Sequence, residues 1–251
     1  MRSFGLVLAG LAALLLGGCV QSQLDPASSA NWTPTDRVLL ANAPYTQASI
    51  PNAYKRHLVD YHRREAPGTI VVETDDRYLY YVLPQGKAIR YGVTVGEEAL
   101  AWSGVAKVAR MQEWPAWVPT REIKQRLGNI PDYVEPGPHN PMGARALYLY
   151  QGNKDTLYRI HGTNQPEYIG RAISSGCIRM TNEDAIDLYN RVKTGAPVVV
   201  LPPTRALRLV SSADRAGVHG SRRVATAMRG GGFVFNEQHA HAWLSSSPAR
   251  R

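Results

Sequence analysis

Residues 68–95 read GTIVVETDDRYLYYVLPQGKAIRYGVTV and indicate a β-meander. The runs 69–73, 78–82 and 88–95 are dense in Val, Ile, Tyr and Thr, the residue types that favour strands. The tripeptide PQG at 84–86 can turn the second run into the third. This stretch therefore predicts an antiparallel sheet, and it makes mostly β the expected fold class of the chain.

Further strands are expected later in the chain, at 147–150, 157–161 and 197–201, the last as a buried strand. No internal repeat or heptad pattern occurs. The chain has 251 residues, of which 44% are apolar, so it can bury a substantial core. We therefore expect one mostly β domain with a few short helices.

The helices and loops are expected around this sheet. Thr181 and Asp184 have the spacing of a capping box before apolar residues spaced by three and four, which predicts an amphipathic helix. A helix is also expected within 50–65. Between the predicted strands, the Trp- and Pro-rich stretch 113–120 leads into a short helix ending at Leu127 and then into the loop 131–141; long loops of this kind often build sites on β scaffolds.

The stretch 174–180, SSGCIRM, contains a cysteine sixteen positions after His161, and the chain has only 2 cysteines. A thiol becomes a good nucleophile when an imidazole takes its proton, so Cys177 and His161 are a candidate nucleophile and base. The alternative is that Cys177 is a small buried residue and His161 a core histidine, neither of them catalytic. A helix N-terminus just after Cys177 would favour the thiolate, and loop N–H groups there are candidates for an oxyanion hole.

The N-terminus has the organisation of an export signal. Arg2 precedes an apolar run at 4–16 that is too short to cross a bilayer. The stretch LGGC at 16–19 resembles a bacterial lipobox, which implies cleavage before Cys19 and lipid attachment to its sulfur. An ordinary signal with a coincidental cysteine is the alternative. With Val20 after the cysteine, we expect a periplasmic protein anchored by lipid to the outer membrane.

The chain carries a formal net charge of +9, much of it in the segment 202–251, which has eight arginines and two acidic residues. In an exported protein the expected counterions are anionic wall polymers, lipid phosphates or acidic peptides, not nucleic acid. A merely solvated, flexible tail is the alternative. Glu237, His239 and His241 are weak metal-ligand candidates in that tail, and we expect neither a metal nor a cofactor.

Four motifs together resemble the YkuD-type L,D-transpeptidases, over roughly half of the chain. They are HGT at 161–163, SSGC at 174–177, IRM at 178–180 and NPMGAR at 140–145. The resemblance implies a β-sandwich or barrel that acts on peptidoglycan stem peptides. A cysteine thiolate would attack the bond between the third-position diamino acid and D-Ala, and the acyl-enzyme would pass its acyl group to an amine.

The resemblance also implies residue roles and segment boundaries. Cys177 is the expected nucleophile and His161 the base, with the Gly162 carbonyl orienting the ring and Gly176 beside the oxyanion hole. Arg179 is expected to pair with a stem-peptide carboxylate. The alternative role for Arg179 is a structural ion pair that holds the loop. The remaining site candidates are Ser174, Ser175, Asn140, Gly143 and Arg145. Alternatively, the last three only fix the conformation of their loop. The expected segments are a lipoprotein signal peptide at 1–18, a tether and lead-in helix at 19–66, a catalytic domain at 67–201 and a basic, flexible tail at 202–251.

Many relatives carry a histidine where this chain has Ser175, so a second imidazole is missing. The acyl acceptor stays open: an amine of another stem would give a 3-3 cross-link, an outer-membrane protein would be attached to the wall, and water would make a carboxypeptidase or endopeptidase. A non-catalytic peptidoglycan-binding lipoprotein is the alternative from another class of function. Retention of the cysteine, histidine and arginine together favours an enzyme.

Overall fold

The computed structural model describes residues 29, 31–97 and 102–203. It confirms the expected mostly β architecture. Nine strands form one sheet in the order β1-β4-β3-β2-β11-β6-β7-β8-β10, and two more form a small parallel pair, β5 and β9. No helix in these residues is long and apolar enough to span a bilayer. The expected signal peptide, Cys19 and the tail from 204 onward lie outside the described residues.

The first half of the sheet is the expected meander. The strands β2 (Ile70–Glu73), β3 (Tyr78–Leu83) and β4 (Lys87–Gly92) pair antiparallel. The run expected at 88–95 is divided, because β4 ends at Gly92 and the short β5 (Val95–Gly96) pairs with β9 (Ala172–Ser174) instead.

The second half carries the long strands β6 (Gly104–Glu113), β7 (Arg145–Gln151) and β8 (Lys154–His161), followed by the short β10 (Ile178–Arg179). Strand β11 (Pro197–Leu201) joins the halves, parallel to β2 and antiparallel to β6. Sequence reasoning missed β6, β9 and β10. Helix α4 (Asn182–Arg191) begins after Thr181, as expected, and its apolar side packs on β7 and β8.

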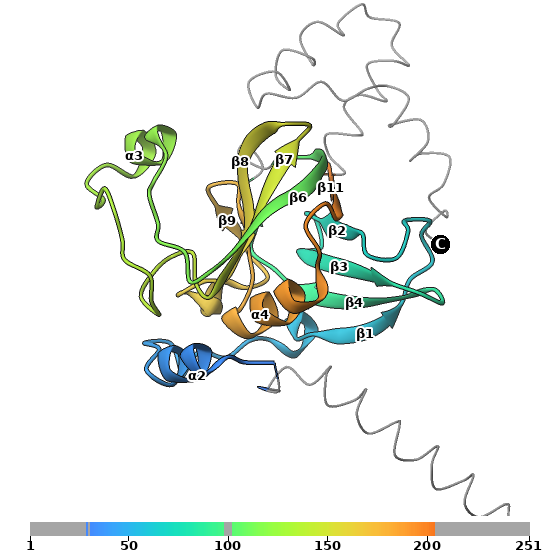
Figure 1. Ribbon diagram of the computed structural model, residues 1–251, viewed down its shortest axis with the longest axis horizontal. Helices are drawn as coiled ribbons and strands as arrows, with labels where there is room; N and C mark the ends of the chain where they lie inside the picture. The colour runs from blue at the N-terminus through green and yellow to red at the C-terminus, as the bar shows by residue number, and fades with distance from the viewer. Residues whose placement is uncertain (1–28, 30, 98–101, 204–251) are drawn as a thin grey trace, which may run out of the picture.

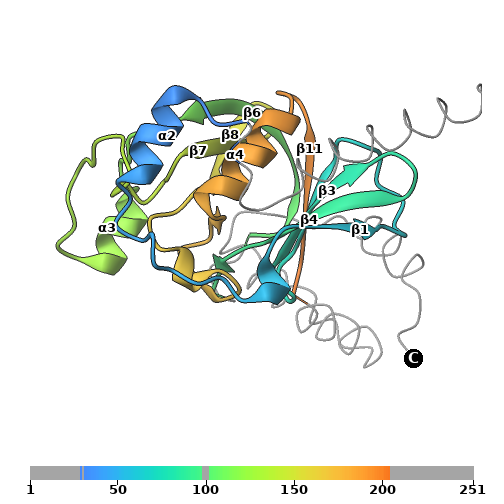
Figure 2. The ribbon, with the colours of Figure 1, turned by 90° about the horizontal axis from the view of Figure 1, so that it is seen from below.

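Residues 31–66 differ from the expected tether and lead-in helix. Helix α2 (Pro34–Ala41) lies on the same side of the sheet as α4 (Figure 2), and Leu40 packs in a cluster with Ile186. The helix expected within 50–65 is wrong: this segment forms a single 3-10 turn, η1 (Asn52–Tyr54), and then the edge strand β1 (His57–Asp60). Pairing with β4 satisfies the backbone of β1 in place of helical hydrogen bonds.

The long excursion between β6 and β7 carries α3 (Arg121–Leu127), which Figure 1 shows standing away from the body of the sheet. The N-cap is Thr120, whose hydroxyl accepts a hydrogen bond from the Ile123 N–H, and none of the helix residues is buried. The helix ends at Leu127, as predicted. The helix is held to the rest of the molecule by its flanking loops and by individual polar contacts.

Candidate active site

Two adjacent parallel strands bring the predicted thiol and imidazole to one face of the sheet. In the register of β8 and β10, Ile160 lies opposite Ile178 and His161 opposite Arg179. The two isoleucines are buried in the main core. Because side chains alternate along strands, His161 and Arg179 lie on the other face, and Cys177, just before β10, shares that face.

The nucleophile loop is folded by a serine. The Ser174 hydroxyl donates a 2.5 Å hydrogen bond to the Cys177 carbonyl and accepts one of 3.2 Å from the Gly176 N–H. Gly176 has a φ of 115°, in the region that favours glycine. Ser174 therefore shapes the turn, and the Gly176 N–H expected at the oxyanion hole is engaged by that hydroxyl.

The Cys177 thiol is partly buried and is not in a disulfide. Burial raises its pKa above the ordinary value, and a hydrogen bond with the Arg159 backbone and the guanidiniums of Arg159 and Arg179 only partly offset this. The expectation that a helix N-terminus would favour the thiolate is wrong, because β10 separates Cys177 from the start of α4 at Asn182. The resting sulfur is therefore a neutral thiol at neutral pH.

His161 is buried, with 4% of its surface exposed. Its Nδ1 lies 2.6 Å from the Gly162 carbonyl oxygen. Burial and the charge of Arg179 lower the pKa of the ring to about 3, although hydrogen bonds to the backbone of Gly162 and Met142 act in the other direction. A carbonyl oxygen can only accept, so Nδ1 carries the proton and Nε2 keeps a lone pair in the neutral ring. The imidazole is thus available as a base at neutral pH.

A buried amide that sequence reasoning missed holds the turn after His161. The Asn182 side chain accepts from the Ala144 N–H at 2.8 Å and donates to the Thr163 carbonyl at 3.0 Å. It also donates to the Tyr45 hydroxyl. A Cβ added at Gly143 or at Gly162 would lie 2.1 Å from the Asn182 amide oxygen, so both glycines are required by close packing. No sequence signal identifies Asn182, because polar residues are common in the first turn of a helix.

Two residues of the NPMGAR motif are not exposed to a substrate. Asn140 is 1% exposed and folds its own loop, donating to the carbonyls of Val134 and Glu135 and accepting from the Met142 N–H. Arg145 is also 1% exposed, and its guanidinium pairs with Asp36 at 2.7 Å. This burial favours the alternative role given for Arg145, the fixing of a loop, over substrate binding. Sequence reasoning could not find its partner, which is 109 residues away.

Arg179 has different surroundings. Within the described residues, no carboxylate lies within the 4.0 Å limit of an ion pair with Arg179 or with Arg126 of α3. Arg126 donates to the Ser175 hydroxyl at the start of the nucleophile loop. Burial and the charge of Arg126 lower the pKa of Arg179. Arg179 thus lies close to Cys177, and Arg126 contacts the loop that precedes it.

No group of three residues that could hold a metal ion occurs in the described part of the chain. The weak candidates Glu237, His239 and His241 lie outside it. The candidate site consists of a thiol, an imidazole and guanidiniums. This set of side chains is suited to acyl transfer from an anionic peptide.

Comparison with known proteins gives the site its family. The chain is 37% identical over 141 residues to the probable L,D-transpeptidase ErfK/SrfK of Escherichia coli K12, covering 53% of this chain and 43% of that protein. It is 33% identical over 139 residues to the probable L,D-transpeptidase YbiS of the same organism, covering 52% of this chain and 43% of that protein. The matched segment thus spans less than half the length of either relative.

Among solved structures, one from Brucella melitensis described as a probable carnitine operon oxidoreductase is 45% identical. It covers 62% of this chain and 99% of that one with a TM-score of 0.41, and its description names another reaction class. L,D-transpeptidase 3 from Mycobacterium tuberculosis is 17% identical, with coverages of 53% and 60% and a TM-score of 0.40. These scores are low, so the assignment rests on sequence. Residues 67–200 match the family described as the YkuD L,D-transpeptidase catalytic domain, and the chain belongs to this family of enzymes.

Proposed function

We propose that the chain is a peptidoglycan L,D-transpeptidase in which Cys177 is the nucleophile and His161 the general base. The observation that carries this proposal is the β8–β10 register, in which His161 lies opposite Arg179, two residues after Cys177. A neutral imidazole with a lone pair on Nε2 beside a neutral thiol is the protonation state that such a base needs.

The proposed acylation is a coupled step. The Cys177 sulfur adds to the carbonyl between the third-position diamino acid and D-Ala while His161 Nε2 takes the thiol proton. Because the thiol pKa is raised and the imidazole pKa lowered, a resting ion pair is disfavoured, and the proton moves as the C–S bond forms. Collapse of the tetrahedral adduct breaks the C–N bond, and the imidazolium returns the proton to the leaving D-Ala nitrogen. A thioester remains on Cys177.

The acceptor then reverses these roles. Its amine attacks the thioester carbonyl, His161 removes a proton from the attacking nitrogen, and Cys177 leaves as a thiol. An amine of another stem gives a 3-3 cross-link, an amine of an outer-membrane protein gives wall attachment, and water gives hydrolysis. The two amines give transpeptidation, which the family name supports.

Arg179 and Arg126 are the proposed carboxylate receptors of the donor stem. Arg179 lies two residues beyond the nucleophile, and a carboxylate bound there would receive charge-assisted hydrogen bonds. Arg126 of α3 reaches the same loop through its contact with Ser175. A serine at this position thus meets an arginine from α3, where many relatives carry a histidine. Ser175 is accordingly proposed to orient Arg126 rather than to act as an acid or base.

The catalytic assignment is tested by incubating purified protein with tetrapeptide muropeptides and analysing the products by mass spectrometry. We expect Cys177→Ala and His161→Ala to keep the fold and lose product formation. Products that persist in Cys177→Ala would overturn the nucleophile assignment. A fold that binds muropeptides but never converts them in the wild-type protein would favour the non-catalytic alternative.

The acceptor is tested in the same reaction by adding a candidate outer-membrane protein. A 3-3 linked dimer, a protein–muropeptide adduct and a shortened tripeptide have different masses, so one experiment separates cross-linking, attachment and hydrolysis.

We further propose that the protein is periplasmic and lipid-anchored through Cys19 at the outer membrane. The support is the sequence pattern at 1–20 alone. Membrane fractionation of cells expressing the wild type and Cys19→Ala tests it. Release of the variant into the soluble fraction is expected, and an equal membrane association of both proteins would count against a lipid anchor.

A further inference from the structure

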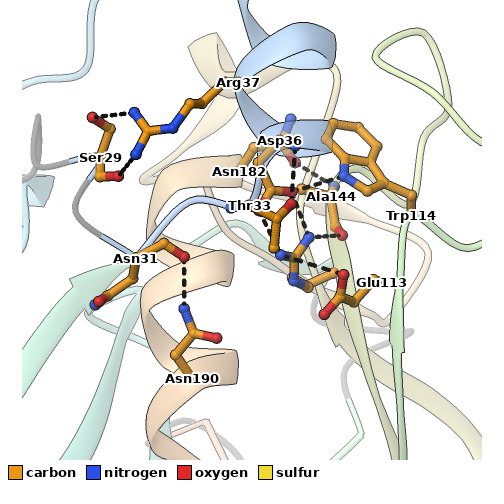
Figure 3. A network of polar contacts seen from close by, with 11 residues as sticks. Ser29, Asn31, Thr33, Asp36, Arg37, Glu113, Trp114, Ala144, Asn182 and Asn190 are labelled. Carbon is orange, nitrogen blue, oxygen red and sulfur yellow. Dashed lines mark hydrogen bonds and ion pairs between the residues drawn. The ribbon is translucent and has the colours of Figure 1, made fainter.

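Helix α2 lies outside the matched family segment, yet it contributes a fully buried carboxylate with several partners. Asp36 is 0% exposed. It caps its own helix with Thr33, as Figure 3 shows, and accepts a hydrogen bond of 2.8 Å from the Trp114 indole nitrogen. Both of its oxygens also accept from Arg145, at 2.8 and 2.7 Å. Burial raises the pKa of Asp36, but the hydrogen bonds from Arg145, Thr33 and Trp114 outweigh it, so the group is charged.

A short chain of contacts connects this carboxylate to the candidate base. Asp36 fixes the Arg145 guanidinium, and the Arg145 main-chain carbonyl accepts from the Gly162 N–H at 2.9 Å. The Gly162 carbonyl is the group that receives the His161 Nδ1 proton at 2.6 Å. The orientation of the ring, and hence the direction of Nε2, depends on where the peptide of Gly162 lies.

A second contact from the same N-terminal segment supports that peptide. Tyr45 contacts the Asn182 amide, which in turn binds the Ala144 N–H and the Thr163 carbonyl on either side of Gly162. The arginine and the asparagine therefore hold the turn from two directions. Residues of 33–45 contact both of them, although this segment supplies no group to the thiol itself.

We propose that residues 33–45 are part of the catalytic unit and that Asp36 is a positioning residue, which acts through Arg145 and Gly162 on His161. This inference rests on the proposed function, since it concerns the base of that reaction. The variant Asp36→Asn preserves the shape of the side chain but removes its charge. Its amide presents an N–H toward a guanidinium that can only donate, so the bidentate contact is lost.

The test follows His161 by nitrogen NMR of histidine-labelled full-length protein and, separately, follows kcat and KM on tetrapeptide muropeptides. In Asp36→Asn we expect the His161 ring to lose its single Nδ1–H tautomer. We expect kcat to fall roughly tenfold to a hundredfold, with KM nearly unchanged, because a misdirected base slows chemistry rather than binding. Trp114→Phe removes one donor to Asp36 and is expected to show a smaller change in the same direction, so it decides the question if Asp36→Asn does not fold.

Arg56→Met is the matched control. It removes another buried ion pair of the N-terminal segment, which Arg56 makes at 2.8 Å with Asp187 of α4 and not with Arg145. We expect this control to lose stability while the His161 signals and kcat stay as in the wild type. Unchanged His161 signals in both Asp36 and Trp114 variants, or equal changes in the control, would overturn the proposal. The NMR comparison decides even if wild-type protein shows no turnover, which would instead defeat the proposed function.

Discussion

Two arginines flank the candidate base on neighbouring strands, and their surroundings are opposite. Arg145 begins β7, where the next residue pairs with His161, and it is fully buried against Asp36. Arg179 pairs with His161 from β10 and has no carboxylate within ion-pair distance in the described chain. Removing one partner of a buried ion pair leaves an uncompensated charge and destabilises the fold, whereas an arginine without a carboxylate partner has no such pair to lose. The difference separates a structural arginine from a proposed substrate-binding arginine, although both belong to sequence motifs of the family.

The largest expected effect comes from breaking the matched pair. Asp36→Ala leaves the Arg145 charge buried without its partner, which should lower the free energy of unfolding by about 3–5 kcal/mol. Urea unfolding at neutral pH measures this. Arg179→Met, in contrast, should leave the free energy of unfolding unchanged or raise it. Replacing both members of the pair, as Asp36→Leu with Arg145→Met, should recover much of the loss. If Arg179→Met proved as destabilising as Asp36→Ala, the contrast between the two arginines would be wrong.

The unmatched arginine should affect the reaction instead. Losing a charge-assisted hydrogen bond costs about 1.5–3 kcal/mol, so Arg179→Met should lower kcat/KM on tetrapeptide muropeptides by roughly tenfold to a hundredfold. A donor whose terminal carboxyl group is amidated provides the control. The wild type and the variant should differ little on that donor if this carboxylate is the partner. An undiminished difference would mean that Arg179 recognises another group.

The two arginines should also differ in their effect on His161. Burial and the charge of Arg179 lower the pKa of the ring. Arg179→Met should therefore raise the pKa of His161 from about 3 toward its ordinary value, and NMR titration of the ring measures this. A fall, or no change, would show that the guanidinium does not act on the imidazole.

The same shift affects stability below neutral pH. A histidine with a lowered folded-state pKa contributes stability that is present above its unfolded value of about 6.5 and is lost as the pH falls toward its folded value. Asp184 acts in the opposite direction, because burial raises its pKa to about 7. Asp184→Asn should therefore steepen the loss of unfolding free energy between about pH 6.5 and 4, by at most about 1.4 kcal/mol per pH unit. Parallel curves for the variant and the wild type would contradict this.

The smallest expected effect belongs to Arg126, which is exposed on α3. Arg126→Ala should raise KM only a few-fold, because solvent screens exposed charges and such pairs contribute about 0.2–1 kcal/mol. The same amidated donor serves as its control. A loss of kcat as large as that of Arg179→Met would mean that α3 contributes directly to the chemistry.

Local sequence patterns predicted local elements well. The β-rich runs at 69–73 and 78–82, the helix after Thr181 and the strand at 197–201 were expected at or near their observed positions, since propensity and capping act over a few residues. Strand β6 was missed because two of its three buried positions are the small residues Gly104 and Ala106, and it contains no strong aromatic or β-branched run. The short strands β9 and β10 depend on pairing with β5 and β8, so the local sequence does not predict them.

The site was predictable in its residues but not in their roles. The thiol and imidazole motifs singled out Cys177 and His161, whose catalytic roles stay predictions, and the strand register sets His161 opposite Arg179. A structural role for Arg145 could be given only as an alternative, because its partner Asp36 lies far away along the chain. The expected thiolate-favouring helix end was wrong for a similar reason: β10 depends on pairing with β8 and intervenes before α4. Contacts of this kind can be identified only in the folded structure, because their partners are far apart in the sequence.

The position of β11 constrains the order in which this protein can fold. It is the last strand of the described chain, yet it lies in the middle of the large sheet between β2 and β6. The two halves of the sheet cannot be joined until residue 201 has been synthesised, and closing such distant contacts is slow. A nascent chain that lacks β11 therefore cannot complete its core, although the earlier strands have already been synthesised. That delay suits the export proposed above, in which the chain would cross a membrane before it folds.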